Sequence, residues 1–139
     1  MREARPDPKF PMNLSSYTLS IDEVATPKLI GEVISQLPNH EDPFATLAVD
    51  TYTYIQCLWT EDGFILEYQD GSIDRHYCSG DYLSSDAVIA ALVQYHNNED
   101  IWRTNIEFYR KNLRGFWGNL GYQIGCFIGS LTRGFKGSN

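Results

Sequence analysis

Three apolar or aromatic runs follow one another between residues 44 and 78, with only short turns between them. The runs are Phe44–Val49, Tyr52–Thr60 and Phe64–Tyr68. Glu61-Asp62-Gly63 separates the last two runs, and Asp70-Gly71 follows the third. Both turns are typical of hairpins because glycine tolerates positive φ. Since Ile73–Cys78 closes the series, we expect a meander of four neighbouring antiparallel strands.

Helix and strand signals also lie on both sides of this meander. Tyr17–Ile21 alternates loosely and is expected to form a first strand. Thr26-Pro27 then starts a helix with proline at its first position, and apolar residues recur at helical spacing up to Pro38. Ser84-Ser85-Asp86 offers N-cap chemistry for a second helix, which should end near Asn97.

Together these elements predict one α+β domain over residues 14–110, with an antiparallel sheet of four to five strands packed with two helices. A chain of 139 residues with a hydrophobic fraction of 42% suits one packed core. Residues 1–13 are rich in proline and are expected to form a flexible lead. Residues 101–109 fit either a short helix or a last strand, and we favour the strand.

Charge divides the chain into two unequal parts. Residues 1–100 carry 5 Lys or Arg and 17 Asp or Glu, a net charge of -12, whereas residues 101–139 carry 6 and 1, a net charge of +5. An acidic body repels the phosphates of nucleic acids, so we expect no nucleic-acid partner. The same charge favours a basic protein as the partner.

No enzyme motif stands out. The chain contains none of the patterns GxxxxGK[ST], GxGxxG, HExxH or GxSxG. Asp74, His76 and Cys78 would share one face of a strand, and they are the right types for cysteine chemistry. A catalytic triad, however, converges from different elements, so we favour a structural role for them. We expect a non-enzymatic protein with no metal and no cofactor, and keep an enzyme using Cys78 and His76 as an alternative.

The N-terminus and the cysteines bear on the compartment. Residues 1–12 hold no continuous apolar stretch of the kind found in secretory signals, which favours the cytoplasm. The three cysteines Cys57, Cys78 and Cys126 form no CxxC pair, which argues against a disulfide framework and a structural zinc site. We expect free, mostly buried thiols.

Aromatic and acidic side chains accompany the predicted strands. They would form a face suited to an Arg- or Lys-rich surface, although alternation should place about half of the aromatic residues in the core. The candidate partner-binding residues are Tyr52, Tyr54, Trp59, Glu61, Glu67, Tyr68, Asp70, Asp74 and His76.

Residues 111–139 form a basic, glycine-spaced tail that we expect to be helical. Residues 115–132 are uncharged, and glycines at a spacing of four would share one helix face, as in GxxxG pairs. The tail could pack on the protein's own sheet, or lie on a bilayer or another helix with its basic flanks in contact. A membrane span is less favoured, because polar and glycine residues interrupt it. The candidate tail-interaction residues are Arg114, Phe116, Trp117, Gly121, Gly125, Gly129 and Arg133.

One stretch resembles a group of small bacterial proteins that share the pattern DGFxLEYQxGSxDxHY, followed by a helix ending in Tyr and then a Trp. Here the stretch begins at Asp62-Gly63 and ends at His76-Tyr77, and Tyr95 and Trp102 take the later places. The resemblance covers roughly residues 44–108 and implies an α+β domain with an antiparallel sheet. Some such proteins look similar to immunity proteins, which block a toxin by binding it. The basic tail departs from this pattern.

These observations lead to two functional hypotheses. The first is a non-enzymatic protein-binding domain of the immunity type, which neutralises a basic toxin through an acidic, aromatic sheet face. The second is a membrane-surface or oligomer-forming adaptor that acts through residues 113–136. We expect a cytoplasmic protein, which the second hypothesis would place at the periphery of the membrane.

Overall fold

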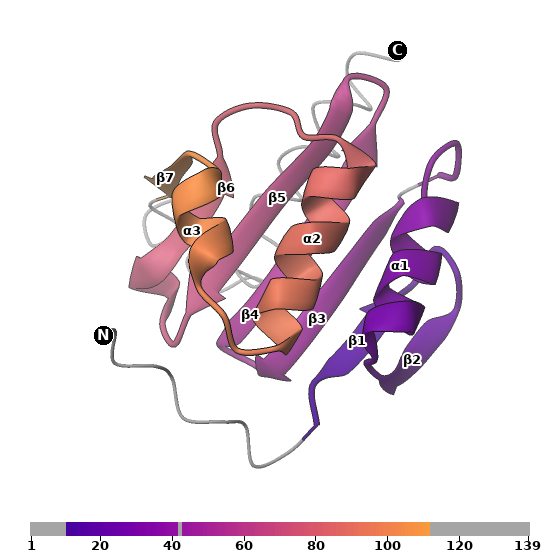
Figure 1. The fold of residues 1–139 in the computed structure, drawn as a ribbon, viewed down its shortest axis with the longest axis horizontal. Coiled ribbons are helices and arrows are strands. Elements are labelled where there is room, and N and C mark those ends of the chain that lie inside the picture. Colours follow the sequence, from indigo (N-terminus) through magenta and orange to yellow (C-terminus); the bar gives the residue numbers. More distant parts are fainter. Residues whose placement is uncertain (1–10, 42, 112–139) are drawn as a thin grey trace.

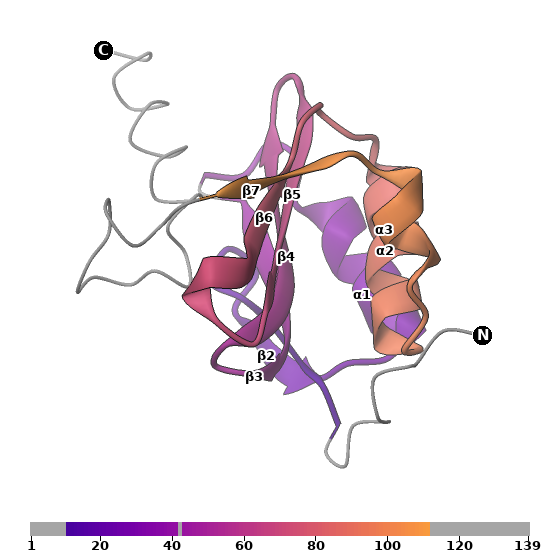
Figure 2. The same cartoon turned by 90° about the vertical axis from the view of Figure 1, so that its left-hand side faces the viewer.

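The computed structural model describes residues 11–41 and 43–111, which form a twisted sheet with helices packed on one of its faces (Figures 1 and 2). In chain order the elements are β1 (Asn13–Ser16), β2 (Ile21–Val24), α1 (Pro27–Gln36), β3 (Phe44–Asp50), β4 (Thr53–Thr60), β5 (Gly63–Asp70), the 3₁₀ helix η1 (Ile73–Arg75), β6 (His76–Ser79), α2 (Ser85–His96), α3 (Ile101–Asn105) and β7 (Phe108–Lys111).

The sheet has the strand order β2-β1-β3-β4-β5-β6-β7, and every neighbouring pair is antiparallel. The strands β3 to β6 are the predicted meander. Gly63, with φ of 131°, begins β5, and Gly71, with φ of 87°, follows it. Both glycines therefore adopt the positive φ that the hairpin signals predicted.

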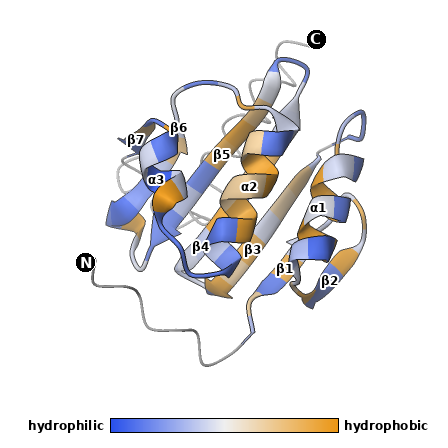
Figure 3. Cartoon of the chain, in the orientation of Figure 1, coloured by the Kyte–Doolittle hydropathy of each residue, from blue (hydrophilic) through white to orange (hydrophobic). Residues whose placement is uncertain are grey.

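The core lies between the sheet and the helices. Apolar residues dominate α2 (Figure 3), and its Val88, Leu92 and Tyr95 are buried. From the sheet, Leu14, Leu47, Ile55 and Leu66 belong to the same buried cluster, as do Ile30, Val33 and Ile34 of α1. One sheet face is thus covered by α1, α2 and α3. Within residues 11–41 and 43–111 no α-helix lies on the opposite face, which we call the helix-free face (Figure 2).

Side-chain caps confirm both predicted helix starts. The Thr26 hydroxyl oxygen accepts a hydrogen bond from the Leu29 backbone N–H at 3.1 Å, directly before Pro27. The Ser84 hydroxyl accepts from the Ala87 N–H at the same distance. Each cap satisfies one of the N–H groups that a helix leaves without an internal partner.

The sheet is larger than the sequence indicated, with seven strands rather than four to five. The predicted first strand, Tyr17–Ile21, is wrong for most of its length, because residues 17–20 form the turn between β1 and β2. Tyr17 is 90% exposed there, and Ser20 has φ of 56°. Each flanking strand has only four residues, so its alternation is too short to detect.

Two further segments combine helix and strand. In residues 101–109, where we favoured a strand, α3 comes first and β7 begins at Phe108. The predicted strand Ile73–Cys78 likewise starts as η1, because the Ser72 hydroxyl accepts from the Asp74 N–H at 3.0 Å and caps that turn. A third helix, α3, joins the two that were predicted.

The chain ends lie mostly outside the described residues. Residues 1–10 of the predicted lead and residues 112–139 of the predicted tail fall there, whereas Lys111 belongs to β7. Met12 is buried in the core and Asn13 begins β1, although both had been assigned to the lead. Over residues 11–41 and 43–111, no helix has the length and apolar character needed to cross a membrane.

We predict that Trp102→Ala lowers the free energy of unfolding by about 3–5 kcal/mol. The Trp102 ring is buried, meets Tyr68 edge-on at 4.8 Å between centroids, and donates from Nε1 to the Glu99 carbonyl at 2.9 Å. Urea unfolding followed by circular dichroism measures the change. The neighbouring Ile101 is 56% exposed, so Ile101→Ala should shift the value by less than about 0.5 kcal/mol. Equal losses for the two variants would contradict this account of the core.

Candidate functional site

Strand register lines up one continuous row of side chains on the helix-free face. Residues opposite one another on antiparallel strands point to the same face. Successive partners across β2, β1, β3, β4, β5 and β6 define the polar row, which consists of Asp22, Ser15, Thr46, Gln56, Glu67 and Cys78. The row therefore crosses the sheet from the edge strand β2 to β6.

Glu67 is the centre of a buried hydrogen-bond network in this row. Its side chain is fully buried, and its Oε1 accepts from Gln56 Nε2 at 3.1 Å. The same oxygen lies 2.9 Å from His76 Nε2, while the Cys78 thiol lies 3.9 Å from Oε2. A buried carboxyl group is costly unless it is hydrogen-bonded, and this one has partners at both of its oxygens.

His76 joins Glu67 to a second branch of the network. Its Nδ1 lies 3.0 Å from Gln69 Oε1, and the Tyr54 hydroxyl donates to the same oxygen at 3.3 Å. Gln69 Nε2 donates to the Tyr52 carbonyl at 3.2 Å, which fixes the orientation of the amide. With oxygen acceptors at both ring nitrogens, either the imidazole holds two protons or one of them resides on Glu67.

This arrangement does not support cysteine chemistry at Cys78. Both ring nitrogens of His76 are engaged by Glu67 and Gln69, so neither is directed at the thiol. Asp74 lies in η1 and is exposed, outside the strand face that His76 and Cys78 share. Cys57 points into the core, where burial raises the pKa of its thiol to about 12.

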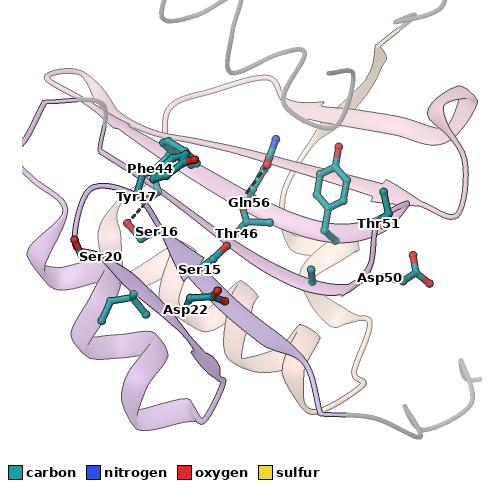
Figure 4. A pocket seen from close by; sticks show the side chains of 13 residues that line it. Ser15, Ser16, Tyr17, Ser20, Asp22, Phe44, Thr46, Asp50, Thr51 and Gln56 are labelled. Carbon is teal, nitrogen blue, oxygen red and sulfur yellow. Dashed lines mark hydrogen bonds between the residues drawn. The ribbon is translucent and has the colours of Figure 1, made fainter. Parts of the chain in front are cut away.

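A pocket of about 800 Å³ opens on the helix-free face across β2, β1, β3 and β4 (Figure 4). Its described lining has two carboxylates, Asp22 and Asp50, and no Lys, Arg or His. Tyr17, Phe44 and Tyr54 contribute aromatic rings, and most of the remaining lining is hydroxyl- and amide-bearing. Thr46 and Gln56 belong both to this lining and to the polar row, so the pocket and the buried network are in contact.

Local hydrogen bonds position the two pocket carboxylates. Asp22 Oδ1 accepts from Asn13 Nδ2 at 2.7 Å, across the β1–β2 pair. Asp50 Oδ1 accepts from the Tyr52 backbone N–H at 2.9 Å, which holds it at the turn after β3. At the rim, Tyr17 is highly exposed and meets Phe44 edge-on, with 6.4 Å between ring centroids.

The structure separates the nine predicted partner-binding residues. Tyr54, Glu67 and His76 come together in the buried network, and of the three only Tyr54 also lines the pocket. Tyr68 lies on the helix side, where the Arg103 guanidinium sits 5.0 Å from its ring centroid. Trp59 also packs against the core. The Asp70 carboxylate lies 3.6 Å from the Arg103 guanidinium. The remaining three residues, Tyr52, Glu61 and Asp74, are exposed. The nine residues therefore do not share one face of the sheet, and which of them bind a partner stays a prediction.

Sequence reasoning missed most of the pocket. Ser15, Asp22, Thr46 and Gln56 were not singled out, because each is an ordinary polar residue of a strand. Only the pairing of β2 with β1, and of β1 with β3, brings Asp22 onto the same sheet face as Thr46, and neither β1 nor β2 was predicted with its actual bounds. The alternation of Thr46 and Ala48 with buried Ala45 and Leu47 was the one available signal.

Comparison with protein-family models, curated proteins and solved structures finds no match to this chain. The fold and the site therefore define it only as an α+β protein with a seven-stranded antiparallel sheet and a polar pocket on the helix-free face. Within the described ranges, no group of three or more His, Cys, Asp or Glu is placed to hold a metal ion. The predicted tail-interaction residues lie beyond Lys111, outside the described part of the chain.

We predict that Glu67→Leu lowers the free energy of unfolding by about 3–5 kcal/mol, because it leaves His76 and Gln56 buried without their acceptor. Urea unfolding of this variant, of His76→Leu and of the double variant measures the coupling. The double variant should lose less than the sum of the two single losses, since it removes both members of the pair. Additive losses would show that the two side chains act independently.

We also predict that Cys57 remains unmodified by thiol reagents in the native protein at mildly alkaline pH. Because burial raises its pKa from 9.0 to about 12, the reactive thiolate is almost absent there. The stabilisation linked to the protonated thiol is complete below pH 9.0 and is lost as the pH rises towards about 12. Mass spectrometry of a Cys78→Ser/Cys126→Ser variant tests this, with the same variant in concentrated urea as the positive control. Rapid native labelling would contradict the burial of Cys57.

Proposed function

We propose that this chain is a non-enzymatic protein-binding domain that receives a basic partner in the pocket of its helix-free face. The observation that carries the proposal is the pocket itself, which has Asp22 and Asp50 in its lining and no described cationic residue. A basic side chain that enters the pocket meets complementary charge and aromatic surface, which are the usual components of a binding hot spot.

The charge of the described surface supports the same class of partner. Residues 11–41 and 43–111 contain fifteen Asp or Glu and five Lys or Arg, a formal net charge of -10. Such a field accelerates the approach of a positively charged protein and repels an acidic one. Exposed Tyr17 and Tyr52, at 90% and 44%, flank the acidic residues with aromatic contact area.

The proposal keeps the immunity-type hypothesis but changes the residues that carry it. In place of nine residues along the meander, contact falls to Asp22, Asp50 and Tyr17, with Tyr52 at the periphery. A protein of this type would neutralise a basic toxin by occupying the positively charged surface that the toxin needs. The resemblance of residues 44–108 to proteins similar to immunity proteins is the reason for naming this class.

The alternative function, an adaptor at the membrane surface or in an oligomer, depends on residues 113–136. These lie outside the described residues, and no observation on residues 11–111 favours it. It remains a hypothesis from the sequence.

We predict that the product of the adjacent gene, if it is a basic protein, binds this chain and that Asp22→Asn/Asp50→Asn weakens binding by about tenfold or more. Both substitutions keep an oxygen for the local hydrogen bonds from Asn13 and Tyr52 but remove the charge. Calorimetric titration at low and at physiological salt measures the affinity, which should fall as salt rises.

The matched control is Glu32→Gln/Glu99→Gln, which removes the same charge from two exposed residues on α1 and after α2. It should change affinity much less, because those residues lie on the helix side. Equal effects of the two double variants, or affinity that does not depend on salt, would remove the pocket as the binding site.

A further inference from the structure

We infer that the pocket is built for a cationic group that only donates hydrogen bonds, best met by the guanidinium of an arginine, and that buried Glu67 sets this selectivity. This rests on the proposed function and names the chemical group that the pocket takes. The role of Glu67 is indirect, since Glu67 is not among the lining residues. It acts as a positioning residue through two branches of the network.

In the first branch, Glu67 fixes the orientation of the Gln56 amide. Glu67 Oε1 lies 3.1 Å from Gln56 Nε2 and accepts from it whichever of Glu67 and His76 holds their shared proton. A rotated amide would bring two oxygens face to face in a fully buried place, which is strongly unfavourable. Gln56 Oε1 must therefore point the other way, towards Thr46.

The orientation of Gln56 in turn fixes the hydroxyl of Thr46. Thr46 Oγ1 lies 3.3 Å from Gln56 Oε1 and must donate to it, since an amide oxygen only accepts (Figure 4). A hydroxyl has one proton and two lone pairs. With its proton used on Gln56, Thr46 presents only lone pairs to the pocket that it lines. Ser16 is in the same position, because its hydroxyl donates to the Phe44 carbonyl at 2.6 Å.

The second branch runs from Glu67 through His76 to Tyr54. Glu67 holds one ring nitrogen of His76, so the other faces Gln69 Oε1 at 3.0 Å. That oxygen also accepts the hydroxyl proton of Tyr54, whose ring lines the pocket. Both branches therefore direct hydroxyl protons away from the pocket. Glu67 sets the first branch, and in the second it acts together with the Tyr52 carbonyl, which orients the Gln69 amide.

The two carboxylates of the lining and the ring at its edge complement the same ligand. Asp22 and Asp50 only accept hydrogen bonds when ionised, and they come from β2 and from the end of β3. The exposed ring of Tyr17 offers a face on which a planar guanidinium stacks. A guanidinium has five N–H donors and no acceptor, so it can match several fixed acceptors at once. The ammonium group of a lysine has the same charge as a guanidinium, but it has fewer N–H donors and is not planar.

Two small cations separate hydrogen bonding from charge. Ethylguanidinium has N–H donors, whereas tetramethylammonium has the same charge but no hydrogen-bond donor. Titrations of the isotope-labelled full chain, followed by nuclear magnetic resonance, should show ethylguanidinium binding about tenfold more tightly, with the largest shifts at the Thr46 and Gln56 amides. Methylammonium is the third arm and represents lysine. We expect it to bind between the other two.

Glu67→Gln tests the positioning role. The new amide can donate to Gln56, which lets the Gln56 amide turn over and frees the Thr46 proton to face the pocket. We expect the preference for ethylguanidinium over tetramethylammonium to fall from about tenfold to nearly one. Binding of tetramethylammonium reports any loss that comes from charge alone. Asp86→Asn, at an exposed residue of α2, is the matched control and should leave the preference unchanged.

Thr46→Val provides an independent variant if Glu67→Gln does not fold. It removes one fixed acceptor without disturbing the Glu67–His76 pair, and should also reduce the preference several-fold. Equal binding of the two cations to the unmodified chain, or an unchanged preference in the folded variants, would overturn the inference. In that case the pocket would respond to charge alone. Binding of a basic partner protein would still be tested separately, by the Asp22→Asn/Asp50→Asn variant.

Discussion

The helix-free face depends on one buried carboxyl group. Glu67 lies in the middle of the sheet with no exposed surface, and its Oε1 holds both Gln56 and His76. Without that oxygen, Gln56 Nε2 and His76 Nε2 would each be buried without the partner that it has there. Three fully or almost fully buried polar side chains, Gln56, Gln69 and His76, are therefore linked directly or indirectly to Glu67. The apolar face beneath the helices, by contrast, depends on the packing of many side chains rather than on one shared atom.

The two faces of the sheet have different functions for this reason. The helix side provides the free energy of folding through packed rings and aliphatic side chains, with Trp102 and Tyr95 among the largest. On the helix-free side, the burial of polar groups offsets part of that free energy. The hydrogen bonds of these groups, in return, have fixed directions. A surface with defined directions can distinguish a donor from an acceptor, which a merely acidic surface cannot. The proposed binding of a basic side chain uses this distinction.

Sequence reasoning reached the fold class, the β3–β6 meander and both helix caps, because each depends on signals within a few residues. Gly63, Thr26 and Ser84 carry their information locally. The four-residue strands β1, β2 and β7 escaped it, since their bounds follow from pairing with distant strands rather than from alternation. The pocket was missed for the same reason, because its lining comes from strands that are distant in the sequence. Asp22 and Gln56 are 34 positions apart in the chain, and only the register of four strands places both in one pocket.

The shared oxygen of Glu67 also constrains how this sequence can change over time. An apolar residue at position 67 would leave both Gln56 and His76 without a hydrogen-bonding partner, and one at position 56 or 76 would remove one partner from Glu67, so single steps away from the present set are unfavourable. A pair or trio of simultaneous replacements could instead produce a dry, apolar interior of similar volume. The network is thus an evolutionary barrier: relatives of this protein should keep these three positions all polar or exchange them together, while the surrounding core residues drift one at a time.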